Sequence, residues 1–138
     1  MKVTLSQTSR PLQYIAANDS TQIEVGANQD NPSKRTFRPM ELILAGLASC
    51  SAIDIENILR KQRINFNNLR ISATGTRADS TPAVFTKINL FIEIEGDVPE
   101  EKLKRAIQLT KDKYCSVSHM LREHVEITYS SKIKPYTT

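Results

Sequence analysis

The segment from about Pro39 to Gln62 predicts one long helix, and it constrains the fold more than any other part of the sequence. Proline is tolerated in a first helical turn, where no intrahelical N–H bond is needed, so Pro39 marks the start. Apolar residues spread around most of the circumference, at Leu42, Ile43, Leu44, Leu47, Ile53, Ile55, Ile58 and Leu59. Polar residues dominate only near Glu56, Asn57, Arg60 and Lys61. Because a helix that is apolar on nearly every side is a buried one, we expect this helix to be central.

The middle of this helix, residues 45–52, is rich in alanine, glycine and serine and contains Cys50. Small side chains lower helix propensity, but they let another backbone approach closely. We therefore expect a second helix to pack here. Because one chain of 138 residues offers few partners for such a helix, we hypothesise that the packing forms a subunit interface.

Short β-strands are predicted before the helix, at Val3–Leu5, Leu12–Ala16 and Thr21–Val25, with a turn at residues 18–20. The polar, proline-containing residues 28–35 predict a loop that leads to the helix.

Two longer strands are predicted after the helix, at Leu69–Arg77 and Phe85–Glu95, joined by a hairpin loop over residues 78–83. The second strand alternates apolar and polar residues, which indicates a sheet with one buried face.

Asp97 is predicted to cap a helix that continues to about Lys113, and a second short helix is predicted from about Cys115. Val125–Tyr129 then predicts a last strand. The expected order βββαββααβ is an α+β arrangement, and the length predicts a single domain over residues 1–138.

The composition argues against several classes of partner. The first residues alternate like a strand and lack the apolar core of a signal peptide, and no run approaches the ~18 apolar residues of a membrane span. The net charge is +4, yet basic residues are interspersed with acids and few aromatics accompany them. We expect a soluble cytoplasmic protein that binds neither nucleic acid nor a membrane.

Cys50 and Cys115 are the only two cysteines, 65 positions apart. In a reducing cytosol such cysteines are buried core residues, metal ligands or redox-active thiols more often than a permanent bridge. We expect no metal or other cofactor, because there is no Cys-x-x-Cys pair, and His119 and His124 lack a matching ligand pair and suit a solvated surface.

The segments around the two cysteines, residues 39–50 and 113–118, together with the strand residues 85–88, resemble the OsmC and organic hydroperoxide resistance family over nearly the whole chain. The resemblance implies an OsmC-like fold, in which long central helices pack between sheets in an intertwined homodimer with two interfacial sites.

The resemblance further implies a thiol-dependent peroxidase that acts on organic hydroperoxides. Cys50 would attack the peroxide and become a sulfenic acid, Cys115 would condense with it to a disulfide, and an external thiol would reduce that bond. In the family an arginine held by a glutamate polarises the first cysteine. The candidates here are Arg10, Arg35 and Arg38, with Arg10 favoured over Arg38, and Glu41 is the acid present. Apolar residues near Cys50 favour organic peroxides over hydrogen peroxide, namely Met40, Ile43, Leu44 and Leu47.

Two departures point to an OsmC-like subgroup. Many family peroxidases carry an acid ten positions before the first cysteine, where Met40 stands here, and proline commonly follows the second cysteine, where Ser116 stands. The sequence therefore leaves two alternatives to the peroxidase open. One is a small-ligand binding or redox-sensing protein without turnover, and the other is a pair of inert, buried cysteines.

Overall fold

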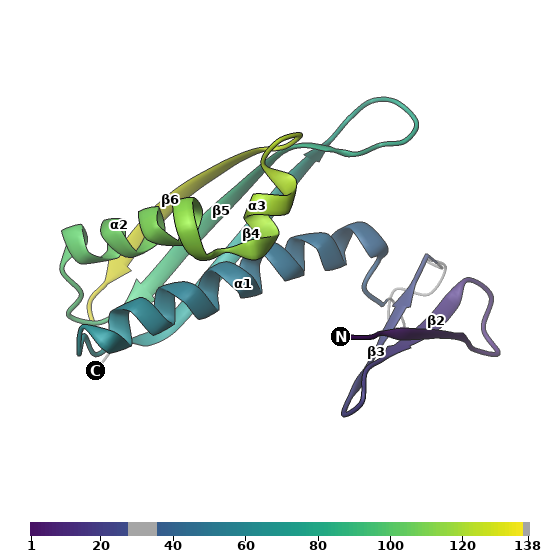
Figure 1. The fold of residues 1–138 in the computed structure, drawn as a ribbon, viewed down its shortest axis with the longest axis horizontal. Coiled ribbons are helices and arrows are strands. Elements are labelled where there is room, and N and C mark those ends of the chain that lie inside the picture. Colours follow the sequence, from purple (N-terminus) through teal and green to yellow (C-terminus); the bar gives the residue numbers. More distant parts are fainter. Residues whose placement is uncertain (28–35, 137–138) are drawn as a thin grey trace. The chain divides into compact units, whose positions relative to one another are not determined.

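The computed structural model describes residues 1–27 and 36–136, and the chain divides into two compact units, residues 1–43 and 44–138 (Figure 1). The predicted loop over residues 28–35, with Arg35, lies outside the described residues. That residues 1–138 form a single domain stays a prediction.

The first unit contains a three-stranded antiparallel meander with the order β1-β2-β3. Its strands are β1 (Thr4–Gln7), β2 (Gln13–Ala17) and β3 (Gln22–Gly26), which confirms the predicted N-terminal strands to within one or two residues. Asn18 makes the tight turn between β2 and β3, because its side-chain oxygen accepts hydrogen bonds of 2.8 Å from the backbone N–H groups of Ser20 and Thr21.

Helix α1 (Pro39–Lys61) begins at the predicted proline and ends one residue before the predicted end. A single stripe of it is fully buried, at four-residue spacing: Leu47, Ser51, Ile55 and Leu59. Other apolar positions are exposed, among them Ile43 at 41% and Ile53 at 60%. The expectation of burial on nearly every side is therefore not met within one chain, because only one face of α1 lies in the core of this chain.

By length and composition, α1 could cross a membrane, since its most apolar 18-residue window has a mean hydropathy of 1.6. The sequence prediction had found no run of that kind. The core helix of a soluble protein passes the same test, and the buried stripe of α1 belongs to the core of the second unit.

The second unit contains the sheet β4-β5-β6, made of β4 (Asn67–Arg77), β5 (Phe85–Glu95) and β6 (Glu126–Lys134). β4 and β5 form the predicted antiparallel hairpin, whereas β6 runs parallel to β5 and is longer than predicted. Gly75 permits the hairpin to close, because a Cβ atom there would overlap the ring of Phe85.

A helical crossover joins β5 to the parallel strand β6 and consists of α2 (Glu100–Leu109), the π-helical turn η2 (Thr110–Tyr114) and α3 (Ser116–Leu121). The prediction that Asp97 caps the first of these helices is wrong. Pro99 is the N-cap residue, with extended backbone and no side-chain cap, and Glu100 and Glu101 provide the negative charge of the first turn.

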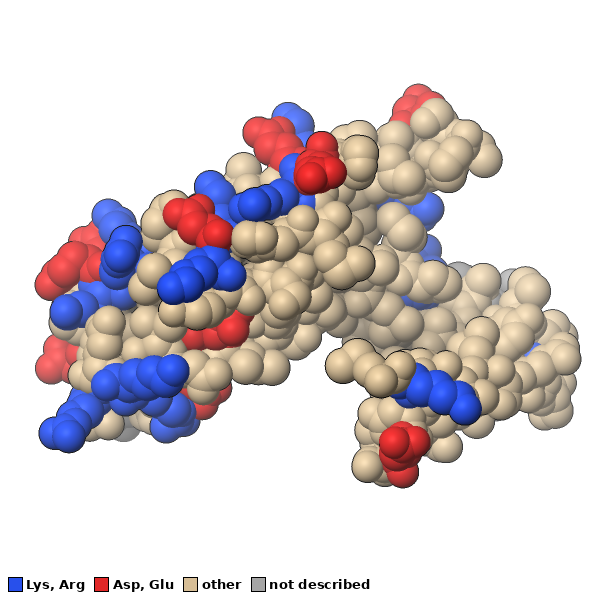
Figure 2. All heavy atoms as spheres, viewed as in Figure 1, with Lys and Arg blue, Asp and Glu red and all other residues tan. Residues whose placement is uncertain are grey.

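Apolar side chains of one face of β5 pack against both α1 and α2. Ile88, Leu90, Ile92 and Ile94 alternate along β5 and are at most 1% exposed, which confirms the predicted buried face. Figure 2 shows basic and acidic side chains mixed on one face of the second unit. The exposed ion pairs of this unit include Lys104–Glu100 and Arg60–Glu56. The predicted α+β class and element order are confirmed.

Candidate functional site

Helix α1 places three polar or reactive side chains on neighbouring positions of its inner side: Cys50, Ser51 and Asp54. Residues four apart on a helix lie one above the other on the same face, so Asp54 follows Cys50 by one turn. Ser51 is fully buried, and Cys50 is half-buried. The helix therefore presents a thiol, a hydroxyl and a carboxylate toward one region of the second unit.

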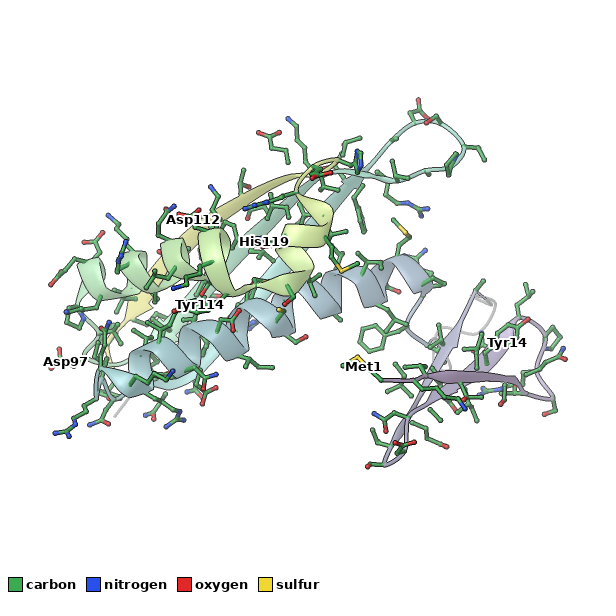
Figure 3. The ribbon with its side chains drawn as sticks, in the orientation of Figure 1. Met1, Tyr14, Asp97, Asp112, Tyr114 and His119 are labelled. Atoms are coloured by element: carbon green, nitrogen blue, oxygen red, sulfur yellow. The ribbon has the colours of Figure 1, made fainter. Side chains whose placement is uncertain are left out.

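The π-helical turn η2 positions Cys115. The N–H group of Cys115 donates to the carbonyl oxygen of Thr110 at 2.9 Å, which closes the widened turn, and Cys115 then becomes the N-cap residue of α3. Its Sγ accepts a hydrogen bond of 3.4 Å from the N–H group of Ser118. Figure 3 labels Asp112, Tyr114 and His119 on this segment, where the ring of His119 lies 3.0 Å from the carbonyl oxygen of Asp112.

The fold brings the two cysteines together. The Sγ atoms of Cys50 and Cys115 and a carboxylate oxygen of Asp54 all lie within 4.8 Å of one another. Both cysteines are free thiols, and Cys115 is completely buried. Two cysteines that are 65 positions apart in the sequence thus have their sulfur atoms within 4.8 Å of each other.

Buried polar atoms surround this pair of sulfurs. The hydroxyl of Ser51 lies 3.7 Å from Sγ of Cys115. Within the described part of the chain, three buried side-chain oxygens make no hydrogen bond, those of Asp54 (Oδ2), Thr110 and Tyr129. Asp54 and Tyr129 both interact with the cysteines, and buried polar atoms are rarely left unpaired, so these two oxygens mark the region as unusual.

Burial raises the pKa of Tyr129, the β6 residue whose ring reaches this region. The neighbouring hydroxyls of Ser118 and Ser51 oppose that shift, although the hydroxyl of Tyr129 makes no hydrogen bond with them, whereas the two neighbouring cysteines add to the shift.

Electrostatics around Cys50 favour the neutral thiol in this chain. Burial raises the pKa of Cys50 most, and the neighbouring Cys115 and Asp54 raise it further, whereas the N–H group of Val117 lowers it. Burial also raises the pKa of Asp54. A peroxidatic cysteine needs the opposite shift, so Cys50 requires positive charge from a group other than these neighbours.

Glu41 and Arg38 form one of two arginine–carboxylate pairs among the described residues of the first unit. Arg38 is the N-cap residue of α1, and the carboxylate of Glu41 accepts from its backbone N–H at 3.0 Å and from its guanidinium at 3.2 Å. The hydrogen bond from the backbone N–H of Arg38 to the side chain of Glu41 is one of the two that define a capping box. The backbone N–H group of Arg38, and then its guanidinium, lower the pKa of Glu41.

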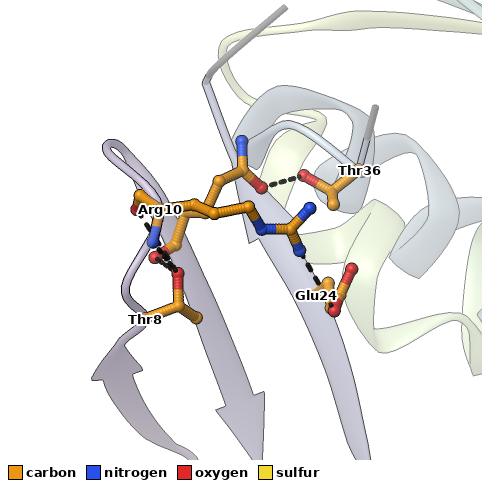
Figure 4. Close-up of polar contacts among 5 residues, drawn as sticks. Thr8, Arg10, Glu24 and Thr36 are labelled. Atoms are coloured by element: carbon orange, nitrogen blue, oxygen red, sulfur yellow. Dashed lines mark hydrogen bonds and ion pairs between the residues drawn. The ribbon is translucent and has the colours of Figure 1, made fainter. Parts of the chain in front are cut away.

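Arg10 and Glu24 form the second pair, with a distance of 3.5 Å between the guanidinium and the carboxylate (Figure 4). The loop that carries Arg10 is fixed by Thr8, whose hydroxyl donates to the carbonyl oxygen of Gln13 at 2.9 Å. Glu24 and Glu41 line one open pocket of the first unit together with Ile23, Thr36 and Phe37. Of the three arginine candidates, Arg10 and Arg38 are thus each paired with an acid, although the sequence did not predict Glu24 as the partner of Arg10.

The structure thus places Arg10, Arg38 and Glu41 in the first unit and Cys50 and Cys115 in the second. Their catalytic roles stay predictions. Sequence reasoning missed Asp54, Ser51, Thr110 and Tyr129. The signal for Asp54 was present, because Cys50-x-x-x-Asp54 is the spacing that puts two side chains on one helix face.

The second unit also has a pocket of about 290 Å³ beside this cluster. Asp54 lines it together with Asn57, Ile58, Lys61, Gln62, Leu109 and Tyr114. Asp54 therefore lies beside the two cysteines and also lines an open pocket between α1 and the helical crossover.

A long core helix, two three-stranded sheets and two adjoining free thiols define an α+β protein with a paired-cysteine site. The chain belongs to the OsmC-like protein family, because the sequence model of that family matches residues 26–130.

Among curated relatives, the Escherichia coli K12 protein named YhfA is 36% identical over 104 residues, which are 75% of this chain and 78% of that protein. The uncharacterised protein MJ0573 of Methanocaldococcus jannaschii is 31% identical over 67% of this chain and 49% of its own length.

Solved structures agree with the fold. A hypothetical protein from Aquifex aeolicus matches with a TM-score of 0.86 and 28% identity over 99% of this chain and 97% of that one. The organic hydroperoxide resistance protein OhrB of Bacillus subtilis matches with a TM-score of 0.65 and 14% identity, over 96% and 98% of the two chains. At 14% identity, the likeness to OhrB shows the fold alone.

Proposed function

We propose that this protein is a cytoplasmic thiol-dependent peroxidase that reduces organic hydroperoxides in defence against oxidative stress. The observation that carries the proposal is the approach of the two sulfur atoms to within 4.8 Å. A disulfide has an S–S distance of about 2.05 Å, so closing it requires the sulfurs to move by less than about 3 Å.

Cys50 is the attacking residue in this proposal, because it is the more accessible of the two thiols. Its thiolate attacks the distal oxygen of the hydroperoxide, the O–O bond breaks, and Cys50 becomes a sulfenic acid while the alkoxide takes up a proton and leaves as an alcohol. Cys115 then attacks the sulfur of Cys50. The S–S bond forms, the proton of Cys115 and the hydroxide of Cys50 leave as water, and two equivalents of an external thiol restore both cysteines.

Cys50 needs a cation in order to react at neutral pH, because its surroundings in the second unit raise its pKa. We assign that role to Arg10 or Arg38, each already oriented by a carboxylate. The chain works as a homodimer in this proposal. The support is α1, which leaves Ile43 and Ile53 exposed beside a segment of small residues.

The preference for organic peroxides rests on the apolar residues before Cys50. Met40 and Leu44 are half-buried and Ile43 is exposed, so they remain available to an alkyl chain, whereas Leu47 is completely buried in the core. Leu47 is therefore not among the residues proposed to contact the substrate.

A steady-state assay tests the proposal. Wild-type protein with a dithiol reductant is expected to consume cumene hydroperoxide faster than hydrogen peroxide, and Cys50→Ser to abolish consumption. Cys115→Ser is the matched control, since it keeps the attacking thiol and is expected to stop at the sulfenic acid, detectable by dimedone labelling. Equal or faster turnover of hydrogen peroxide would remove the organic preference.

A second candidate is a small-ligand binding or redox-sensing protein without turnover. The raised pKa of Cys50 favours its ligand-binding form, because a redox-sensing cysteine also needs a low pKa. A sensor would be oxidised once by a stoichiometric amount of peroxide and would show no sustained consumption in the presence of reductant. Sustained turnover at a rate that depends on Cys50 excludes it.

A further inference from the structure

Three potential metal ligands converge in the second unit, from two elements of the fold. Cys50 and Asp54 stand one turn apart on α1, and Cys115 stands between η2 and α3. One ligand atom of each lies within 4.8 Å of the other two. Two ligands at i and i+4 on a helix, completed by a third from another element, form a common architecture for protein metal sites.

The distances suit a zinc ion. Zinc binds thiolate sulfur at ~2.3 Å and carboxylate oxygen at ~2.0–2.2 Å, so neighbouring ligand atoms of a tetrahedral site are separated by roughly 3.5–3.8 Å. Atoms that already lie within 4.8 Å of one another can reach this geometry by small side-chain movements. Thiolate ligands favour zinc over the hard cations magnesium and calcium.

Charge gives an independent reason to expect a cation here. Oδ2 of Asp54 is buried and makes no hydrogen bond with any described residue. Cys50, Cys115 and Asp54 are all acidic groups, and one ligand atom of each lies within 4.8 Å of the other two. A divalent cation among these three groups would turn their mutual repulsion into attraction and would satisfy the unpaired oxygen.

Hydrogen-bond donors also surround the sulfurs. The N–H group of Ser118 donates to Sγ of Cys115 at 3.4 Å, and the hydroxyl of Ser51 lies 3.7 Å from the same atom. Donors of this kind stabilise and orient metal-bound thiolates.

We propose that the reduced protein binds one Zn²⁺ per chain through Cys50, Cys115 and Asp54, with the fourth position open to water or a small ligand. Binding replaces the two thiol protons by zinc and releases them to solvent. Disulfide formation between Cys50 and Cys115 removes both sulfur ligands, so zinc binding and oxidation of the pair exclude one another. The sequence prediction of no metal considered only cysteine and histidine spacing and therefore overlooked Asp54.

The test uses reduced, metal-free, full-length protein under anaerobic conditions and no peroxide, so its outcome is independent of peroxidase activity. Titration with Co²⁺ is expected to give one ion per chain, with near-ultraviolet thiolate-to-cobalt absorption and the visible bands of tetrahedral cobalt, and Zn²⁺ is expected to displace it. Asp54→Asn, which has nearly the same shape, is expected to weaken binding by roughly tenfold or more.

Asp97→Asn is the matched control, because it makes the same change at an exposed position and is expected to leave affinity unchanged. Cys115→Ser is expected to reduce the thiolate-to-cobalt absorption, and circular dichroism checks that it folds. Absence of that absorption in the wild type overturns the proposal. So does equal affinity in Asp54→Asn and wild type, or binding lost in His119→Gln, which would identify an adventitious surface site.

Discussion

The carboxylate of Asp54 lies within 4.8 Å of Sγ of Cys50, and Asp54 follows Cys50 by one helical turn on α1. This relationship adds negative charge beside a thiol whose pKa is already raised by burial. It makes the reactivity of Cys50 depend on what balances that charge, either an arginine or a bound cation.

Asp54→Asn is expected to lower the pKa of Cys50, because the substitution removes one of the charges that raise it. Burial raises the pKa of Cys50 more than Asp54 does, so we expect the effect of the substitution to be modest. Alkylation of Cys50 by iodoacetamide at pH 8 in metal-free protein is expected to be roughly two- to fivefold faster. The measurement uses Cys115→Ser as background, so that only Cys50 reacts. An unchanged or slower rate would contradict this electrostatic role, and Asp97→Asn controls for general charge effects.

Arg10→Ala is expected to lower kcat/KM for an organic hydroperoxide by about a hundredfold, the effect typical of removing one electrostatic donor from a reacting group. Arg38→Ala is expected to have the smaller effect on kcat/KM, because Arg10 is the favoured candidate. The backbone N–H group of residue 38 remains available to Glu41 in that variant. Arg77→Ala is the control, because Arg77 is exposed and donates to the carbonyl oxygen of Ala83 in the hairpin loop. The reverse ranking of Arg10 and Arg38 would move the polarising role to Arg38.

Glu41→Gln is expected to destabilise the protein at neutral pH and to have little effect in acid. Hydrogen bonds from Arg38 lower the folded-state pKa of Glu41 below its ordinary value of 4.5. The stabilisation is therefore fully present above pH 4.5 and is lost as the pH falls through the folded-state pKa. Urea unfolding of both proteins at pH 7 and pH 3 measures it. A difference that persists at pH 3 would contradict the ionic origin.

Replacement of both Ile43 and Ile53 by Asp is expected to convert a dimer into a monomer in sedimentation experiments. Both side chains are exposed on α1, so the substitutions leave the buried stripe of the helix intact. Val84→Asp is the control, because Val84 is similarly exposed but lies in the β4–β5 loop. A wild-type monomer would remove the dimer from the proposed function.

Much of the fold could be predicted from periodicity. The alternation of β5 fixed its bounds at Phe85–Glu95, and Pro39 fixed the start of α1. The parallel pairing of β6 with β5 could not be read from so short a pattern, since it depends on the length and path of the helical crossover. The N-cap residue of α2 is Pro99 and not the predicted Asp97. Both residues lie in the loop before α2, where the sequence offers more than one candidate for the N-cap position.

The two cysteines of the candidate site were apparent in the sequence, whereas their surroundings were not. In the sequence, Asp54 is one polar residue within an apolar helix. Its approach to the sulfur of Cys115 depends on which face of α1 packs against the helical crossover, and that is a property of the tertiary structure. The π-helical turn at Thr110–Tyr114 shifts Cys115 relative to a regular helix, and no residue in that turn predicts it. Tyr129 reaches the site because β6 lies beside β5, which is a property of the tertiary structure.

Peptide mapping after exposure to one equivalent of an organic hydroperoxide tests the central claim most directly. We predict that the reduced protein loses both free thiols, yields one disulfide-linked peptide pair containing Cys50 and Cys115, and releases one equivalent of the alcohol. Retention of both thiols, or an oxidised Cys50 that never joins Cys115, would contradict the account of this pair as one catalytic site.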